Sequence, residues 1–409
     1  MTREARLVVL FASAGHFWHH VLTGLFLTLA VLLEAVWDRP YAEIISLWTL
    51  GAMLIGLGAP LAGWLADRIG HARMMAVFYL GIGASSVAAG FVAGPSGMAV
   101  ALAAIGLFGA IYHPVGMAWV SMTAPVHIRG RIMGYLGIAG SIGVALAAVI
   151  AGGLATIGGW RAAMIVPGVL TMAGGAWLIV AIASGRVAAA AAHAAPLPGA
   201  SSATEDERAP FAVLAVLAVT FSLGSIVYAA FSTALPKWFS DTLSLDAQDA
   251  ARLGLIVGVA LLMGSVGQLV GGRLADRLPF KWLYAGTFAL KLVPLAMAAL
   301  SGGPVAVLLA VIIGFTFDMS APVENLLLAR YSSGRRRGLA FGIKFAMGFA
   351  AAPIGVGLVA WAYGEAGGGA GTLYAILAVL TGLMLAAALL LPGEAGPRRR
   401  VVDAAAPAE

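Results

Sequence analysis

The 409-residue sequence contains no cysteine, and only 10% of its residues are charged. The absence of cysteine excludes disulfide bonds, thiolate metal ligands and cysteine nucleophiles. Soluble globular domains carry about 25% charged residues, so this chain has little surface that faces water. Hydrophobic residues make up 61% of the sequence, and its mean hydropathy is +0.97. These values predict an integral membrane protein.

Several motifs of soluble chemistry are missing as well. The sequence has no Gly-x-x-x-x-Gly-Lys-Ser/Thr loop for nucleotide phosphates, no His-Glu-x-x-His zinc motif and no Gly-x-Ser-x-Gly nucleophile turn. We therefore predict that the protein is not an enzyme and uses no cofactor. The net charge of +6 would suit a nucleic-acid binder. The basic residues instead lie in short turns between apolar runs, so we expect no nucleic-acid partner.

Apolar runs of membrane-spanning length recur along the chain. A helix of about 20 apolar residues crosses the hydrocarbon core of a bilayer. By that measure we predict twelve transmembrane helices near residues 8–33, 42–66, 73–93, 97–122, 131–156, 160–184, 211–236, 251–274, 281–300, 304–329, 339–362 and 371–392.

One long polar stretch, residues 185–209, separates the sixth predicted helix from the seventh. It is rich in Ala, Pro and Ser and contains the charged run Glu205–Arg208, a composition typical of flexible linkers. The fold class predicted is therefore all-α integral membrane, with two pseudo-symmetric six-helix halves. The N-terminal half is residues 1–184, and the C-terminal half is residues 210–409, which end in a short basic tail.

Lysine and arginine are concentrated on one side of the predicted helices. Cytoplasmic loops of membrane proteins hold the excess of these residues. With the N-terminus inside, the opposite side receives only Arg39, Arg161, Lys237 and Arg252. Both termini are therefore predicted to be cytoplasmic. The first apolar run has no small-residue cleavage site, so we interpret it as a retained first helix.

A short charged turn occurs twice in the sequence. The first copy runs from Gly63 to Arg73, after the second predicted helix, and the second runs from Gly272 to Lys281, after the eighth. Tyr112-His113-Pro114 and Ser320-Ala321-Pro322 occupy a second pair of matching positions. An internal two-fold repeat of membrane helices is typical of transporters, whose substrate site lies near the midplane between the repeats.

Twelve helices, a central linker and the run Gly63-Trp-Leu-Ala-Asp67-Arg68-Ile-Gly70 resemble the major facilitator superfamily. Tyr112-His113-Pro114 and a glycine-rich fifth helix are similar to the fosmidomycin-resistance-like exporter branch. Val115 and Gly116 stand where that branch has an acidic residue. The resemblance implies a monomeric secondary transporter of the bacterial inner (plasma) membrane that works by alternating access. Its expected partners are a small-molecule substrate, protons and the lipid bilayer.

The resemblance also implies that the charged turn acts as a conformational latch. In the superfamily, this aspartate meets the N-terminal end of the eleventh helix, here near Gly338–Lys344, in the outward-open state. A carboxylate there gains about 0.3–1 kcal/mol. The alternative is a solvated loop that only sets the topology. The predicted latch residues are Gly63, Asp67, Arg68, Gly70 and Arg73 in the first copy, and Asp276 and Arg277 in the second.

Four histidines lie inside predicted membrane helices. His16, His19 and His20 are three and four residues apart, so they share one face of the first helix. His113 precedes Pro114, which removes a helical hydrogen bond. Ionisable residues in membrane helices usually face the bundle interior, and histidine changes its charge near neutral pH. We predict that these histidines bind protons or substrate; the alternative is neutral rings that hold helices together.

The tenth predicted helix carries two acids, Asp318 well inside it and Glu324 near its cytoplasmic end. Six residues place them on faces about 120° apart in a continuous helix, so we do not expect a carboxylate pair. Asp318 is the best candidate for a protonatable carboxylate. Glu324 is a further candidate for proton coupling or substrate binding, and its alternative role is a charge pair with Lys344.

Three further residues complete the predicted set. Tyr112 and Tyr228 are candidate aromatic contacts for a substrate in the central cavity. Lys291 lies in the middle of a helix that the superfamily fold places at the periphery. Lys291 is either a structural partner for a buried acid or carbonyl or a functional residue, and the sequence leaves both roles open.

Two functions remain open from the sequence. The first is proton-coupled export of a small organic compound, with protons taken up by a subset of Asp318, His20 and His113. The second is transport of a transition metal or metal chelate, because imidazole suits such metals. Its ligands would be His16, His20 and His113; otherwise we expect no metal. A static receptor is disfavoured by the duplicated latch, and an intramembrane enzyme by the missing catalytic motifs.

Overall fold

The computed structural model describes residues 1–189, 211–332, 337–365 and 367–393, and within these ranges the chain is entirely helical. Ten helices in these ranges are long and apolar enough to cross a membrane. One of them, α7 (Arg129–Ala183), leaves helical geometry at Gly158 and Gly159, so it corresponds to two predicted segments. The 19-residue α10 (Phe280–Ala298) completes the predicted set. The prediction of an all-helical membrane protein is confirmed.

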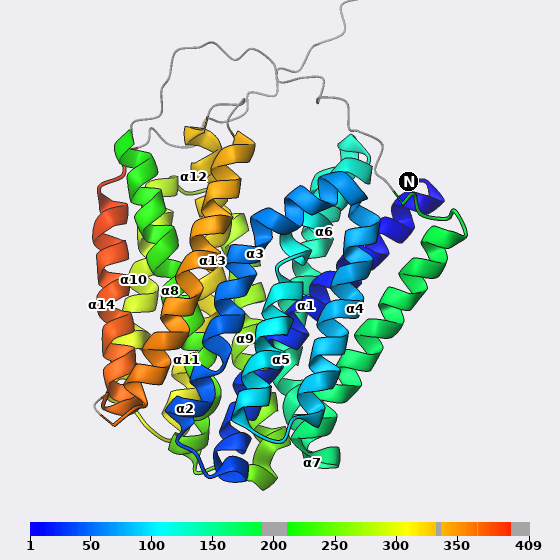
Figure 1. The fold of residues 1–409 in the computed structure, drawn as a ribbon. Helices are drawn as coiled ribbons and strands as arrows, with labels where there is room; N and C mark the ends of the chain where they lie inside the picture. The colour runs from blue at the N-terminus through cyan, green and yellow to red at the C-terminus, as the bar shows by residue number, and fades with distance from the viewer. Residues whose placement is uncertain (190–210, 333–336, 366, 394–409) are drawn as a thin grey trace, which may run out of the picture.

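The helices form two groups in space (Figure 1). The N-terminal helix group is α1 (Arg3–Trp37), α2 (Tyr41–Ser46), α3 (Trp48–Ile69), α4 (His71–Phe91), α5 (Pro95–Gly109), α6 (Tyr112–Thr123) and α7. The C-terminal helix group is α8 (Phe211–Leu243), α9 (Ala250–Ala275), α10, α11 (Pro304–Met319), α12 (Ala321–Tyr331), α13 (Arg337–Ala362) and α14 (Gly369–Leu389). Residues 190–209 of the predicted linker and the basic tail at Arg398–Arg400 lie outside the described residues.

Two predicted helices are broken at matching positions of the repeat. The fourth ends as α5 at Gly109 and resumes as α6 at Tyr112, just before Pro114. The tenth ends as α11 at Met319 and resumes as α12 at Ala321, just before Pro322. Proline lacks a backbone N–H and clashes with the preceding helical turn. Proline therefore accounts for the interruption of the regular helix at each of these places.

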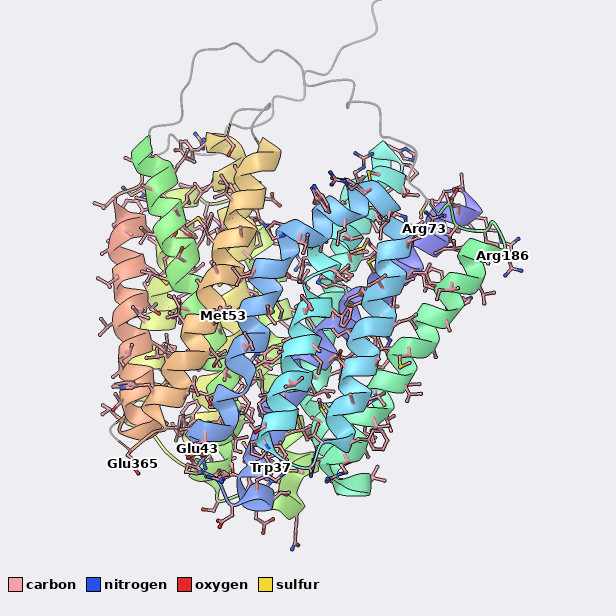
Figure 2. The ribbon with its side chains drawn as sticks, viewed as in Figure 1. Trp37, Glu43, Met53, Arg73, Arg186 and Glu365 are labelled. Atoms are coloured by element: carbon pink, nitrogen blue, oxygen red, sulfur yellow. The ribbon has the colours of Figure 1, made fainter. Side chains whose placement is uncertain are left out.

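Basic and acidic side chains gather at opposite ends of the bundle. Arg73 and Arg186 lie at the end that also holds the N-terminus, whereas Glu43 and Glu365 lie at the other end (Figure 2). We call these the basic end and the acidic end. The helix ends that face each other across the two groups, those of α3 and α13, stand apart at the basic end (Figure 1).

The two helix groups are joined by polar contacts towards the acidic end. Lys237 on α8 forms an ion pair with Glu34 on α1 at 2.8 Å and a second with Asp241 on its own helix at 2.9 Å. Tyr41 on α2 donates a hydrogen bond to the carbonyl of Thr233 on α8 at 3.2 Å. These contacts close the space between the groups on this side.

Glycines allow α7 and α9 to pack backbone to backbone across the two groups. A methyl group at Gly258 would lie 2.8 Å from the carbonyl oxygen of Ala145. Gly152 and Gly254 face each other in the same seam, and a methyl on either would collide with the backbone of the opposite helix. Small residues at helix interfaces are typical of membrane proteins, where association depends on close packing.

Candidate functional site

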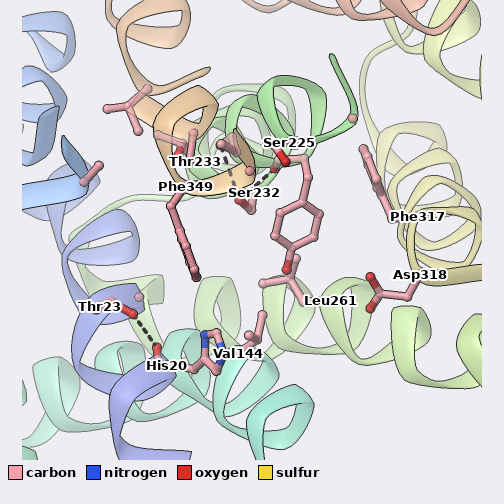
Figure 3. A pocket seen from close by; sticks show the side chains of 18 of the residues that line it. His20, Thr23, Val144, Ser225, Ser232, Thr233, Leu261, Phe317, Asp318 and Phe349 are labelled. Atoms are coloured by element: carbon pink, nitrogen blue, oxygen red, sulfur yellow. Dashed lines mark hydrogen bonds between the residues drawn. The ribbon is translucent and has the colours of Figure 1, made fainter. Parts of the chain in front are cut away.

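A cavity of about 490 Å³ lies between the two helix groups, and both groups line it. Its walls come from α1, α3, α6 and α7 on one side and from α8 to α14 on the other. His20 on α1 and Asp318 on α11 belong to different walls (Figure 3). The lining includes most of the predicted substrate or proton residues: His19, His20, His113, Tyr228, Asp318 and Glu324.

His16 lies behind this lining and orients His20. The Nδ1 atom of His16 is 2.7 Å from the carbonyl oxygen of Leu136, an acceptor, so Nδ1 carries the hydrogen and donates. The Nε2 atom of a neutral His16 is then an acceptor, and it lies 3.2 Å from Nε2 of His20. His20 therefore donates from Nε2 when both rings are neutral, which fixes one orientation for the pair.

Tyr112 holds His16 in place and does not itself line the cavity. The two rings are stacked with their centroids 4.7 Å apart. The Tyr112 hydroxyl donates to the carbonyl of Ala12 at 2.9 Å, so it is occupied inside the N-terminal helix group. On the other side of His16, Gly140 leaves room for the ring, because a methyl group there would lie 2.6 Å from Nε2. The structure thus places Tyr112 as a neighbour of the histidines and not as a cavity residue.

The helix break before Pro114 brings His113 to the histidines of α1. The ligand nitrogens of His16, His20 and His113 all lie within 4.8 Å of one another. The ring of His19 is 4.8 Å from that of His113, and its Nδ1 atom is buried without a hydrogen-bond partner in the described part of the chain. The four membrane histidines therefore form one cluster at the cavity wall, and the three candidate metal ligands are adjacent.

Asp318 extends from the end of α11 towards the cavity (Figure 3). Its carboxylate fits against Gly264 of α9, where a methyl group would lie 2.6 Å from Oδ2. No hydrogen bond or ion pair to this carboxylate is formed within the described residues. The absence of a side chain at Gly264 thus leaves room for the Asp318 carboxylate. Because Asp318 lines the cavity, a proton or a ligand in the cavity can reach this carboxylate.

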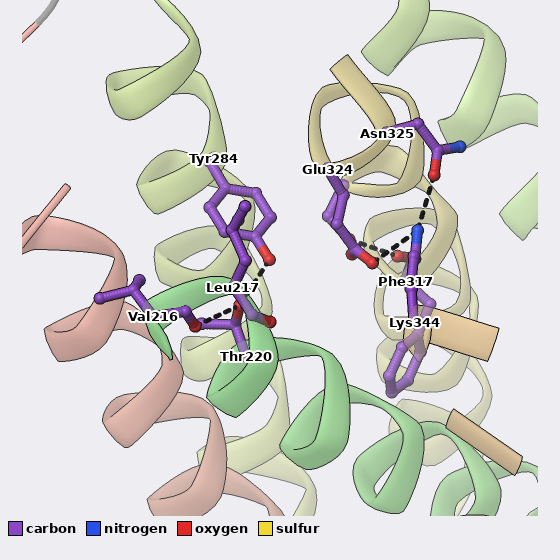
Figure 4. Close-up of polar contacts among 9 residues, drawn as sticks. Val216, Leu217, Thr220, Tyr284, Phe317, Glu324, Asn325 and Lys344 are labelled. Carbon is purple, nitrogen blue, oxygen red and sulfur yellow. Dashed lines mark hydrogen bonds and ion pairs between the residues drawn. The ribbon is translucent and has the colours of Figure 1, made fainter. Parts of the chain in front are cut away.

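Glu324 and Lys344 are in direct contact, as their predicted pairing requires. The Lys344 Nζ atom lies 2.8 Å from Oε1 of Glu324 and 2.6 Å from Oδ1 of Asn325 (Figure 4). Asp318 and Glu324 nevertheless line the same cavity. As expected, the two acids do not form a carboxylate pair, because Glu324 is paired with Lys344 and Asp318 has no ion-pair partner within the described residues.

Lys291 lies at the cavity and not at the periphery that the sequence suggested. Its side chain is only 2% exposed, and its Nζ atom sits 4.1 Å from the centre of the Phe317 ring. The side chain lines the cavity. A lysine has a long flexible stem that carries its charge away from its own helix, so the position of a helix does not fix the position of its ammonium group.

The first charged turn connects α3 to α4. Gly70 adopts a φ of +95°, a conformation that favours glycine, so its role in the turn is structural. Gly63 is not needed for close packing, because a methyl group there would meet its nearest atom at 3.7 Å. Arg68 lies over the ring of Trp64, and Arg73 donates to the carbonyl of Ile69. Asp67 is exposed.

The predicted partner of Asp67, the start of α13, lies only partly within the described residues. Within the described part of the chain, the Asp67 carboxylate forms no hydrogen bond or ion pair. The side chains of residues 337–339, at the start of α13, lie outside that part. The helix ends of α3 and α13 are separated (Figure 1). Among the described residues, the first copy of the motif therefore shows no latch contact.

The second charged turn, between α9 and α10, has a different backbone. Pro279 occupies the position that precedes α10 with a φ of −60°, so this turn needs no glycine. Asp276 and Arg277 are both exposed. The two copies of the motif thus stand at matching positions of the internal repeat, but the backbones of their turns have different conformations.

The sequence analysis missed the ion pair that joins the two helix groups. Glu34 and Lys237 are 203 residues apart, and their spacing carries no local signal. The one available hint in the sequence was the presence of acidic and basic residues inside or beside membrane segments at what the structure shows to be the acidic end, where a charge needs a partner.

Comparison with known proteins agrees with the fold. The Major Facilitator Superfamily model matches residues 9–323 and 248–408. A chloramphenicol resistance protein of Streptomyces lividans is 30% identical over 365 residues, which cover 86% of each chain. Among solved structures, a bacterial homolog of the human lysosomal transporter Spinster, inward-facing and unoccupied, aligns with a TM-score of 0.70 at 15% identity over 95% of each chain.

A second solved structure, the nucleoside transporter NupG, aligns with a TM-score of 0.67 at 13% identity over 93% of this chain and 99% of its own. At such identity these two structures establish the fold alone. The family model and the curated relative cover most of the sequence. The chain belongs to the major facilitator superfamily and is a secondary transporter, not an enzyme.

Proposed function

We propose that this transporter exports a small organic compound in exchange for protons. The observation that carries the proposal is the central cavity, in which the membrane histidines of one wall face the unpaired carboxylate of Asp318 on the other. Both kinds of group take up and release protons, and both are reached from the space that a substrate would occupy. Protons would bind to a subset of Asp318, His20 and His113.

Two further observations support export. The curated relative is named as a chloramphenicol resistance protein, and a resistance transporter protects a cell by moving the compound outward. The run Tyr112-His113-Pro114 resembles fosmidomycin-resistance-like exporters. The expected substrate is therefore a small organic compound, with chloramphenicol as the first to test.

Alternating access would rock two six-helix halves, residues 1–184 and 210–409, about the cavity. With the basic end cytoplasmic in a bacterial inner membrane, as the positive-inside rule indicates, both termini lie inside the cell. The contacts of Glu34 and Tyr41 with the C-terminal helix group then close the outer side. The present state is inward-facing on this assignment, which explains why Asp67 lacks the partner of an outward-open state.

Purified protein in liposomes provides the test. A gradient of one pH unit stores about 1.4 kcal/mol per proton, so exchange of one proton per substrate supports about tenfold accumulation of labelled chloramphenicol or another compound of a small organic panel. We expect accumulation on the acidic side and its collapse with a protonophore. Transport that is unchanged without a proton gradient would rule out the coupling.

The histidine cluster favours a second candidate, transport of a transition metal or its chelate. Zinc–nitrogen bonds of 2.0–2.1 Å in a tetrahedral site place neighbouring nitrogens about 3.3 Å apart. The Nε2 atoms of His16 and His20 are already 3.2 Å apart. The bond from His16 Nδ1 to the Leu136 carbonyl is the outer-shell bond that orients metal-binding histidines. His113 would need only a small approach to be the third ligand.

Metal binding can be measured by titration calorimetry of the purified protein with zinc, cobalt or nickel ions. If the second candidate is correct, the wild type binds one ion, and His20→Gln weakens binding by more than the 10- to 100-fold that loss of an outer-shell partner costs, by order of magnitude. His127→Gln, an exposed histidine far from the cluster, is the matched control. Equal titrations of wild type and His20→Gln would remove this candidate.

A further inference from the structure

Four charged side chains line the central cavity, and they are not all paired. Glu324 and Lys344 form an ion pair at 2.8 Å. Lys291 and Asp318 line the same cavity, but no carboxylate oxygen of the described residues lies within the 4.0 Å of Lys291 Nζ that defines an ion pair. The cavity therefore contains one free positive and one free negative group, both on the C-terminal helix group.

The Lys291 ammonium has an aromatic ring beneath it and no hydrogen-bond acceptor. It lies 4.1 Å from the centre of the Phe317 ring and 5.7 Å from that of Phe288. Within the described residues it forms no hydrogen bond. Asp318 and Glu324 act on this charge electrostatically, but neither forms an ion pair with it. A buried charge without a hydrogen-bonded partner costs several kcal/mol by order of magnitude, and contact with rings offsets only part of that cost. A ligand carboxylate would supply the missing acceptor.

The Asp318 carboxylate, in turn, lacks a hydrogen-bond donor within the described residues. It accepts no hydrogen bond from the described residues, although Gly264 holds it in place at the cavity. The ionisable groups nearest to it come from two other helices, the phenol of Tyr228 on α8 and the ammonium of Lys291 on α10. A ligand ammonium group would supply the missing donor.

Several hydroxyl groups of the remaining lining are engaged within their own helices. The hydroxyl groups of Ser232 and Thr220 already donate to carbonyls of their own helix, those of Tyr228 and Val216. Aromatic and aliphatic side chains cover much of the rest of the wall: Phe221, Leu261, Phe317, Phe349 and Met384. The cavity thus combines two separated opposite charges with an apolar surface.

We propose that the substrate is a zwitterion with an apolar or aromatic body, such as a hydrophobic amino acid or a compound that contains one. Its carboxylate binds Lys291, its ammonium group binds Asp318, and its body packs on the phenylalanines. The inference rests on the proposed function and states how proton binding and substrate binding are coupled. A proton on Asp318 removes the partner of the substrate ammonium, so proton and substrate exclude each other, as exchange requires.

Three related compounds test this proposal in binding measurements on the purified full chain. L-phenylalanine carries both charges, N-acetyl-L-phenylalanine lacks the ammonium group, and L-phenylalanine methyl ester lacks the carboxylate. Hydrogen bonds to charged groups contribute about 1.5–3 kcal/mol. We therefore expect L-phenylalanine to bind about 10- to 100-fold more tightly than either derivative.

Two variants assign each charge to its residue. Lys291→Gln should equalise L-phenylalanine and its methyl ester while the preference over the N-acetyl compound remains. Asp318→Asn should equalise L-phenylalanine and the N-acetyl compound while the preference over the ester remains. Lys281→Gln, on the same helix but outside the cavity lining, is the matched control and should keep both preferences.

Equal binding of the three compounds to the wild type overturns the proposal, as does the absence of binding of all three at millimolar concentration. Unchanged preferences in Lys291→Gln overturn it as well, because a merely structural lysine would lower all three affinities together. None of these outcomes would contradict the proposed function, proton-driven export, for other compounds. Loss of the proton dependence in the liposome experiment, in contrast, would overturn the proposed function whatever the binding ratios.

Discussion

Replacing Asp318 by asparagine is expected to abolish proton-driven accumulation of substrate, while exchange of substrate across the membrane continues at substrate concentrations high enough to offset the weaker binding. Asparagine keeps the shape of the side chain in its niche beside Gly264, but it cannot take up a proton. The groups that face this position are Tyr228, Lys291 and, across the cavity, His20. None of them replaces a carboxylate at the same place, so the cycle should lose its driving proton while the halves still alternate.

The measurement is accumulation in liposomes with a pH gradient, beside counterflow of labelled substrate without one. The wild type should accumulate substrate about tenfold per pH unit if one proton is exchanged per substrate. The Asp318→Asn variant should only bring the substrate concentrations on the two sides of the membrane to equality, and it should retain counterflow. Asp276→Asn, an exposed acid at the end of α9, is the control and should accumulate normally. If Asp318→Asn accumulates like the wild type, the protons are carried by other groups and the assignment to Asp318 is wrong.

Lys237→Met and Asp67→Asn are expected to shift the balance of inward- and outward-facing states in opposite directions. Lys237 joins the helix groups through Glu34 in the present state, and the side chains of this pair are 15% and 34% exposed. A charged hydrogen bond in such a half-exposed setting contributes about 1 kcal/mol, a population change of about fivefold. Asp67 is expected to act in the opposite state, by about 0.3–1 kcal/mol.

The cysteine-free chain makes this shift measurable, because pairs of introduced cysteines can be spin-labelled without background. Labels at Ser46→Cys and Glu365→Cys report the distance between the groups at the acidic end. Lys237→Met should increase the population with this end open, and Asp67→Asn should decrease it without changing substrate affinity.

Matched controls separate these effects from general loss of charge. Arg39→Met breaks an exposed pair with Glu43 inside one helix group, whose side chains are 58% and 59% exposed, and should leave the distances unchanged. Asp276→Asn should do less than Asp67→Asn, because the second turn has a different geometry. If Asp67→Asn and Asp276→Asn are equally harmless to transport and to the distances, the latch is wrong and the motif only sets topology.

Much of the architecture was predictable because it depends on local sequence. Hydropathy marks the helices, since a bilayer admits about 20 apolar residues per crossing. The spacing of His16, His19 and His20 places them on one face of a helix, and the structure puts all three in one cluster. The prolines at 114 and 322 mark helix breaks, because each lacks the N–H that a continuous helix needs.

The contents of the site depended on packing between distant segments. The sequence named Asp318 and Glu324 and indicated that they do not form a carboxylate pair, but only the packing of the helices shows that both acids line the same cavity. The sequence suggested a peripheral position for Lys291, because the position of a helix in the fold does not reveal where the ammonium group of a long lysine side chain lies.

By itself, the sequence determined that this protein is a helical membrane transporter of the major facilitator superfamily and which side chains carry charge inside the bilayer. Only the tertiary structure decided which charges are paired and which are free. Glu34 meets Lys237, and Lys344 meets Glu324, while Lys291 and Asp318 remain open to the cavity. The physical reason is that hydropathy and helix breaks act over a few residues, whereas an ion pair requires two atoms within 4.0 Å, a condition set by the packing of the whole chain.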